Sequence, residues 1–207
     1  MVRTLAACIV FLLICGAGDA DRARSVLAEQ VERTTRGGKT TESIEKVWMR
    51  DGRFRSDAVV QGQKLVTIIR REVSLMVRYS QKTKLGQRYQ LEPELAKILT
   101  SVGDADLDLK GLGTDRRSLT WVRVEKVSGF TCNVYTTSKL KGYTKATVWI
   151  SSDERYPGII RVIRERPGEK VETIARNIKL DVKMPDTLFD VPKGVRITDA
   201  APKRSGK

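Results

Sequence analysis

The feature that most constrains the fold is a succession of short segments with strand-like alternation, separated by glycine-containing turns. In the segment 73–79 every second residue is Val, Leu or Tyr, which is the period of a β-strand with one buried face. Asp51-Gly52 lies between two such segments, and Asp-Gly is a strong hairpin signal. The pattern predicts about ten antiparallel strands. They cover residues 26–35, 41–50, 53–60, 64–70, 73–79, 119–127, 130–137, 143–151, 158–165 and 170–182.

A helical pattern interrupts the strands once, beginning near Glu92. Pro93 suits the first helical position, and acidic residues favour the first turn. Four apolar residues follow at positions i, i+3, i+4 and i+7, which places them in one stripe: Leu95, Ile98, Leu99 and Val102. A helix of about ten residues is marginal alone, so it needs a surface to lie on.

The segment 103–118 is predicted to be a loop. Asp104, Asp106 and Asp108 alternate in it, as acids do at the start of an EF-hand calcium loop, but Leu109 occupies the position that requires glycine. A solvated acidic loop is therefore favoured over a metal site.

A sheet of about ten strands must curl or be covered, because one helix cannot cover it. We expect a mainly β (α+β) fold: a curved antiparallel sheet, or half-barrel, with the short helix as a lid over an apolar concavity. The lid residues are the four of the helical stripe. The same side chains that could line the concavity could also fill a dry core: Trp48, Phe54, Leu75, Met76, Trp121, Trp149 and Ile160.

The N-terminus has the pattern of a secretory signal peptide. Arg3 precedes an apolar run of about 11 residues, and small residues lie at positions 18 and 20. This run is shorter than the roughly 20 residues that a membrane span needs. We expect cleavage after residue 20, a folded domain over 21–198 and a basic, disordered tail over 199–207. An uncleaved anchor, a buried strand and lipidation of Cys15 are the alternatives; Ile14 disfavours lipidation because a small residue normally precedes such a cysteine.

The residue types that are missing limit the chemistry. The chain has three cysteines and no histidine, which excludes Cys–His and Ser–His–Asp catalysis and histidine-based metal or haem sites. Cleavage leaves only Cys132, which cannot form an internal disulfide. Cys132 shares a strand face with Phe130 and Val134, so we expect it to behave as a small buried hydrophobe. No enzyme activity, cofactor or metal is predicted.

The net charge of +14 favours polyanionic partners. For an exported protein these are anionic lipid head groups or cell-envelope polymers, and no nucleic-acid module accompanies the charge. Arg53 and Arg55 are alternate residues of one strand, so they share a face and form a candidate contact with an anionic membrane. The alternative is that the charge serves solubility alone.

Several motifs resemble exported proteins of the outer-membrane lipoprotein carrier (LolA-like) superfamily, particularly its uncharacterised periplasmic branch. The segment 47–55, VWMRDGRFR, is similar to the second hairpin of these proteins. The order of later motifs is also similar, over most of residues 28–195: Gly129-Phe130 with Cys132 and Tyr135, Val148-Trp149-Ile150, Pro157-Gly158, Asn177-Ile178, and the segment 188–194.

The resemblance implies a half-barrel with a helical lid and an apolar interior. It also implies a periplasmic, non-enzymatic protein that carries or senses a lipid or an acylated lipoprotein. We expect a monomer. The alternative is an envelope interaction or sensor protein that uses the same fold without bound lipid.

Overall fold

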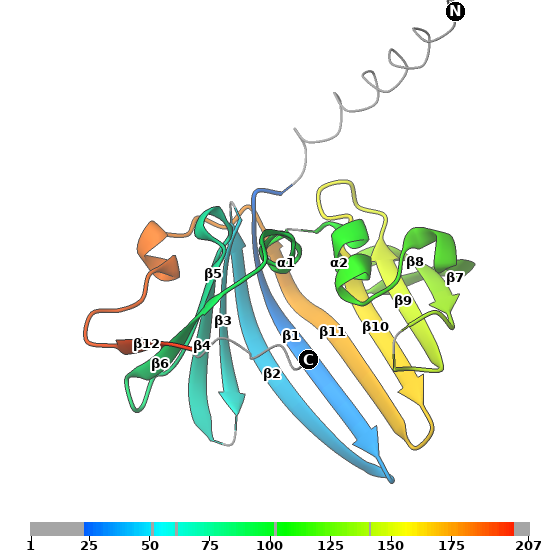
Figure 1. Ribbon diagram of the computed structural model, residues 1–207. Coiled ribbons are helices and arrows are strands. Elements are labelled where there is room, and N and C mark those ends of the chain that lie inside the picture. The colour runs from blue at the N-terminus through cyan, green and yellow to red at the C-terminus, as the bar shows by residue number, and fades with distance from the viewer. Residues whose placement is uncertain (1–22, 51, 61, 102, 141, 201–207) are drawn as a thin grey trace, which may run out of the picture.

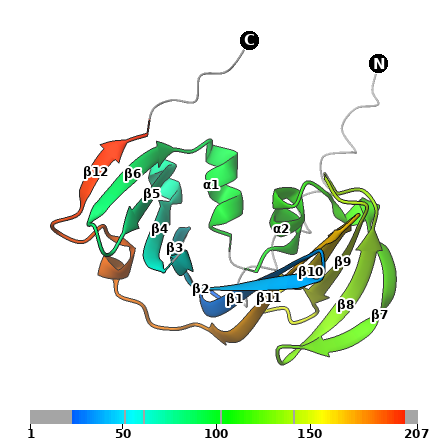
Figure 2. The ribbon, with the colours of Figure 1, turned by 90° about the horizontal axis from the view of Figure 1, so that it is seen from below.

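The computed structural model describes residues 23–50, 52–60, 62–101, 103–140 and 142–200. These residues form one sheet of twelve strands that curves around two short helices without closing (Figures 1 and 2). The strands are β1 (Ser25–Arg36), β2 (Lys39–Arg50), β3 (Arg53–Val60), β4 (Gln63–Arg70), β5 (Leu75–Ser80), β6 (Leu85–Gln90), β7 (Thr120–Val127), β8 (Phe130–Thr137), β9 (Lys145–Ser151), β10 (Ile159–Arg166), β11 (Glu169–Leu180) and β12 (Arg196–Asp199). The helices are α1 (Pro93–Leu99) and α2 (Ala105–Gly111), and single 3-10 turns are η1 (Arg71–Val73), η2 (Arg116–Ser118) and η3 (Asp186–Phe189). The predicted fold class, a mainly β fold built on a curved open sheet, is confirmed.

The strand order is β12-β6-β5-β4-β3-β2-β1-β11-β10-β9-β8-β7. Two meanders, β1 to β6 and β7 to β11, are joined in the middle of the sheet where β1 pairs with β11. The prediction of consecutive antiparallel strands misses β6, and it misses β12, which pairs with β6 in parallel. Neither carries a clear apolar alternation, because β6 has no buried residue and β12 has only four residues.

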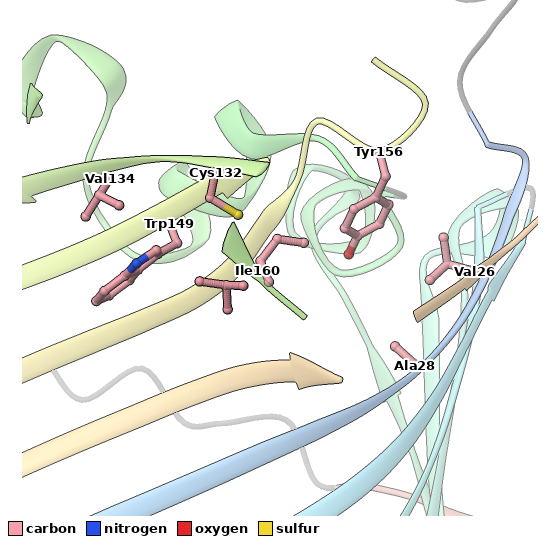
Figure 3. Packing of buried hydrophobic residues seen from close by; sticks show 8 residues of the cluster. Val26, Ala28, Cys132, Val134, Trp149, Tyr156 and Ile160 are labelled. Atoms are coloured by element: carbon pink, nitrogen blue, oxygen red, sulfur yellow. The ribbon is translucent and has the colours of Figure 1, made fainter. Parts of the chain in front are cut away.

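The core lies on both faces of the strands beside α2. Strand β9 is buried along most of its length, and its side chains alternate between the two faces. Val148 and Ile150 pack against α2, whereas Trp149 belongs to a cluster on the opposite face with Cys132 and Val134 (Figure 3). Cys132 is fully buried, which confirms its predicted role as a buried hydrophobe, and burial raises the pKa of its thiol to about 11.

After β11 the chain returns across the sheet, and its last described strand, β12, lies beside β6 (Figure 1). Phe189 of η3 is buried, and three residues that follow it, Val191, Val195 and Ile197, pack on a cluster of β4 and β5. Strand β12 reaches Asp199, and the Ala200 N–H donates to the Arg88 carbonyl at 2.9 Å. The first two residues of the expected tail are therefore part of the fold.

Three other expectations concern the ends of elements. The segment 103–118 is not a loop throughout, because it contains α2. Strand β5 begins at Leu75 rather than Val73, since Ser74 has a positive φ of 49° after η1. Residues 1–20, with the signal peptide and Cys15, lie outside the described residues, as do Val102 and residues 201–207. No helix in the described part of the chain is long and apolar enough to cross a membrane.

Candidate functional site

Both helices lie on the concave side of the sheet, which we call the hollow face (Figure 2). Helix α2 is anchored there by its own sequence. The Asp104 carboxylate caps it by accepting from the Asp106 and Leu107 N–H groups, each at 3.1 Å. Ala105 and Leu109 are buried against β9 and β10. Helix α2 is therefore part of the core.

A carboxylate of α2 is also turned toward the sheet. Asp108 is half-buried as a residue, and its Oδ2 accepts from the Ile159 N–H at 3.3 Å. Burial, with a smaller contribution from the nearby charge of Asp104, raises the pKa of this carboxyl to about 7, although the Ile159 bond lowers it. Asp108 in turn contributes to the raised pKa of the buried Tyr156 phenol.

The connection between the helices is held tightly over the core. Gly103 has a φ of +58°, and a Cβ there would lie 2.7 Å from the Tyr156 ring. Gly158 faces it, because a Cβ on Gly158 would lie 2.8 Å from the Gly103 Cα. Glycine at position 103 therefore serves both a left-handed backbone and a close approach.

Helix α1 is attached much less firmly. Among its residues only Ala96 is buried, and it packs on Ile69 and Leu91 of the hollow face. Leu95 is 43% exposed and Leu99 is 38% exposed. The two leucines of the predicted apolar stripe are therefore open to solvent, although the stripe is expected to rest on the sheet.

The two helices contact each other through an ion pair and a close approach of side chain to backbone. The Lys110 Nζ of α2 lies 2.5 Å from the Glu94 carboxylate of α1. A Cβ on Gly111 would lie 3.0 Å from the half-buried Ile98 side chain. Helix α1 is therefore held partly by its contacts with α2.

Beneath α1, the wall of the hollow face has two adjacent cross-strand rows that differ in polarity. One cross-strand row, formed by Phe54, Ile69 and Met76, is apolar and packs with α1. The next row on the same face holds Ser56, Thr67 and Arg78. The Arg78 Nε donates to the Thr67 hydroxyl at 3.2 Å, and Arg78 is exposed. Apolar and cationic surfaces therefore adjoin on this wall.

The structure separates the seven predicted lining residues. Phe54 and Met76 lie on the hollow face beside α1. The register places Trp48 and Leu75 on the opposite face. Trp149 and Ile160 are buried in the core cluster, and Trp121 is 58% exposed on β7, an edge of the sheet.

The two predicted membrane-contact residues, Arg53 and Arg55, bind groups of their own chain. The Arg55 guanidinium bonds Asp57 at 2.8 Å and donates to the Leu188 carbonyl at 3.0 Å. Arg53 lies 3.4 Å from Asp186 and 3.7 Å from Glu72. Both help to hold the C-terminal segment on β3, and contact with a membrane stays a prediction.

Sequence reasoning missed Arg78 and α2. Arg78 belongs to a segment whose alternation predicts a strand, but its apolar neighbours one row away are known only from the register. Helix α2 did leave a signal: Asp104 is a good N-cap, and Ala105, Leu109 and Leu112 share one helical face.

The acids of 104–108 have structural roles instead of a common metal site. Asp104 caps α2, Asp106 pairs with Arg116, and Asp108 bonds Ile159. In the described residues, no group of three or more acidic or cysteine side chains could hold a metal ion.

A surface cleft of about 670 Å³ lies beside the end of α2. Most of the residues that line it are of polar or charged types: Asp106, Lys110, Gly113, Thr114, Asp115, Arg116, Arg117, Ser118 and Lys139. Two of its cations, Lys110 and Arg116, already pair with carboxylates. No aliphatic or aromatic side chain is among the residues that line the cleft.

No protein-family model and no curated protein matches the chain. Among solved structures, an uncharacterized conserved protein from Thermus thermophilus is similar with a TM-score of 0.56 at 10% identity, over 92% of this chain and 99% of that one. A DUF1329 family protein from Desulfovibrio piger has a TM-score of 0.40 at 18% identity, over 82% and 91% of the two chains. A LolA superfamily protein from Nitrosomonas europaea has a TM-score of 0.42 at 13% identity, over 84% of this chain and 94% of that one. At these identities the likeness is one of fold alone.

Proposed function

We propose that this chain is an exported periplasmic protein that binds an amphiphile, a lipid or an acyl chain, on its hollow face beside α1. The observation that carries the proposal is the exposure of Leu95 and Leu99 on a helix that buries only Ala96. A seven-residue helix gains little stability by itself. Two leucines left open beside an apolar wall are suited to contact with an apolar ligand.

The neighbouring rows of the wall match the two ends of an amphiphile. An acyl chain would contact Phe54 and Met76, the half-buried residues of the apolar row, and be covered by the leucines of α1. Each buried methylene contributes about 0.8 kcal/mol. Arg78 lies on the next row, where it would bind an anionic head group. In the described residues Arg78 pairs with no carboxylate, and its recorded partner is the Thr67 hydroxyl.

A direct binding measurement tests the proposal. Mature protein would be titrated with palmitate and with the corresponding neutral alcohol, by displacement of a fluorescent fatty acid. We expect both to bind, and we expect palmitate to bind more tightly. Arg78→Ala should remove the preference for palmitate and leave the alcohol unchanged, with Lys64→Ala, elsewhere on the sheet, as the matched control. Absence of displacement by either compound would contradict the proposal.

A second candidate function is an envelope interaction or sensor protein that holds no lipid. Trp149 and Ile160, expected to line a cavity, are instead packed in the core, and a filled interior favours this alternative. Lipid-free protein after gentle purification, together with no palmitate binding, would support it.

The proposed site on an anionic membrane rests on the net charge of +14. Mature protein should sediment with anionic vesicles at low salt and be released at about 0.5 M salt, where the Debye length is only a few Å. Equal sedimentation with neutral vesicles would contradict an electrostatic contact.

A further inference from the structure

The two edges of the sheet are protected very differently. Strand β12 is short, pairs in parallel with β6, and carries Asp199, which bonds Arg88 at 2.7 Å. Strand β7 has eight residues and pairs only with β8 among the described strands. Long exposed edges present unpaired backbone groups, and proteins usually shorten, cover or charge them.

Strand β7 also exposes apolar side chains along this open edge. Val124 is 56% exposed, and Val122 and Trp121 are exposed as well. The register shifts between Trp121 and Arg123, so Trp121 and Val124 lie opposite Tyr135 and Asn133, two residues that share a face of β8. The irregularity therefore collects Trp121 and Val124 on one face, which is the face where Tyr135 packs near α2.

The charges of β7 are arranged symmetrically about Val124. Arg123 precedes it and Glu125 follows it. If two copies of the strand pair antiparallel about Val124, each Arg123 lies directly opposite the Glu125 of the second copy. Opposite charges in directly facing positions favour that register.

These charges are already positioned within one chain. The Arg123 Nη2 lies 2.6 Å from the Glu125 carboxylate, which also accepts from the Trp149 indole N–H at 3.2 Å. The hydrogen bond from the buried Trp149 contributes most to the lowered pKa of Glu125, and the hydrogen bond from Arg123 contributes next. Glu125 is therefore held in its ionised form, ready to face a second arginine.

We propose that β7 is a self-association surface, on which a second copy of this chain adds its own β7 antiparallel about Val124 and continues the sheet. Such a two-fold contact is self-complementary and closes on itself. The charge symmetry favours a second copy over an unrelated peptide strand. The inference does not depend on lipid binding, and it replaces the monomer expected from the sequence.

Cysteine cross-linking tests the strand register directly. In the proposed pair Val124 faces its own copy, with Cα atoms about 4.5–5.5 Å apart, within the range that a disulfide spans. Val124→Cys in the mature protein should therefore form a disulfide-linked dimer rapidly under mild oxidation. The native Cys132 is buried and does not compete.

Lys126→Cys is the matched control, because Lys126 is exposed on the same strand. In the proposed register it faces Val122 of the second copy, so its own copies are too far apart to bridge. We expect at least about tenfold slower cross-linking at position 126 than at 124. Equal rates at both positions would contradict the register.

Analytical ultracentrifugation of the unmodified protein tests the association itself. We expect a dimer whose fraction rises with concentration, and Arg123→Glu should shift it toward monomer because like charges would then face each other. A wild-type protein that stays monomeric at every concentration, with no fast cross-linking at position 124, would overturn the proposal.

Discussion

Helices α1 and α2 have seven residues each and lie side by side on the hollow face, yet they are built in opposite ways. Helix α2 has a side-chain cap from Asp104 and buries Ala105 and Leu109. Helix α1 has no side-chain cap and buries only Ala96. Length and apolar content are similar, so the difference lies in which side chains reach the sheet.

The comparison shows that one helix of the pair, α2, is firmly anchored to the sheet, whereas the other, α1, is weakly held. Helix α2 shares the core of β9 and β10, so its loss would unfold that core. Helix α1 contributes few buried contacts, and elements that bind ligands are commonly drawn from such regions of low local stability. We infer that α1 carries the binding contact and that α2 positions it.

The largest expected effect is on the free energy of unfolding, in a matched pair of leucine truncations. Leu109→Ala should lower the free energy of unfolding by about 2–5 kcal/mol, the range for a buried leucine. Leu95→Ala should change it by less than about 1 kcal/mol, because the side chain is largely exposed already. Urea denaturation of the mature protein measures both. Equal losses would show that α1 is as structural as α2.

The next effect is a pH dependence that belongs to α2. The unfolded chain releases the Asp108 proton at a pKa of about 3.9, whereas the folded protein holds it up to about 7. The folded state therefore binds more protons between these values, and the contribution of Asp108 to stability falls as pH rises from about 4 to about 7. The total loss is at most about 4 kcal/mol.

Asp108→Asn isolates this contribution, since an amide oxygen can still accept from the Ile159 N–H. The variant should gain stability over the wild type as pH rises to about 7 and keep a constant difference above it. Thermal unfolding across a pH series measures the difference. A constant offset at every pH would mean that the Asp108 pKa is ordinary.

The smallest effect compares the two helix starts. Asp104→Ala should cost about 1 kcal/mol, the typical value of a lost N-cap. Glu92→Ala should be nearly neutral, because Glu92 makes no cap bond with its side chain. Two similar losses in urea denaturation would show that both helices depend on their caps.

The sequence was sufficient to predict the curved sheet and the position of α1 in the chain, because strand alternation and turn residues are local signals. The burial of Cys132 also follows from the sequence, since its row on β8 is apolar. What local patterns could not show is which face of each strand meets the helices. Trp48 and Phe54 are equally apolar in the sequence, but the register puts them on opposite faces.

The pairing of distant segments was similarly hidden. Strand β12 joins β6 across more than a hundred residues, and its four residues carry no pattern of their own. The helical stripe of α1 predicted a buried leucine face, because amphipathic helices usually bury such stripes. Here Ala96 makes the contact with the sheet instead, and the leucines remain open.

The most direct test of the account is a double variant of α1, Leu95→Asp with Leu99→Asp, assayed for palmitate binding and for unfolding in the same samples. Val59→Asp is the matched control, because Val59 is 60% exposed on the other face of β3. We predict that the double variant loses at least about tenfold in affinity, as expected when leucine contacts of about 1.5–3 kcal/mol each are removed. Its free energy of unfolding should stay within about 1 kcal/mol of the control. A double variant that binds palmitate as tightly as the control, or whose free energy of unfolding falls well below that of the control, would contradict the assignment of α1 as the binding element.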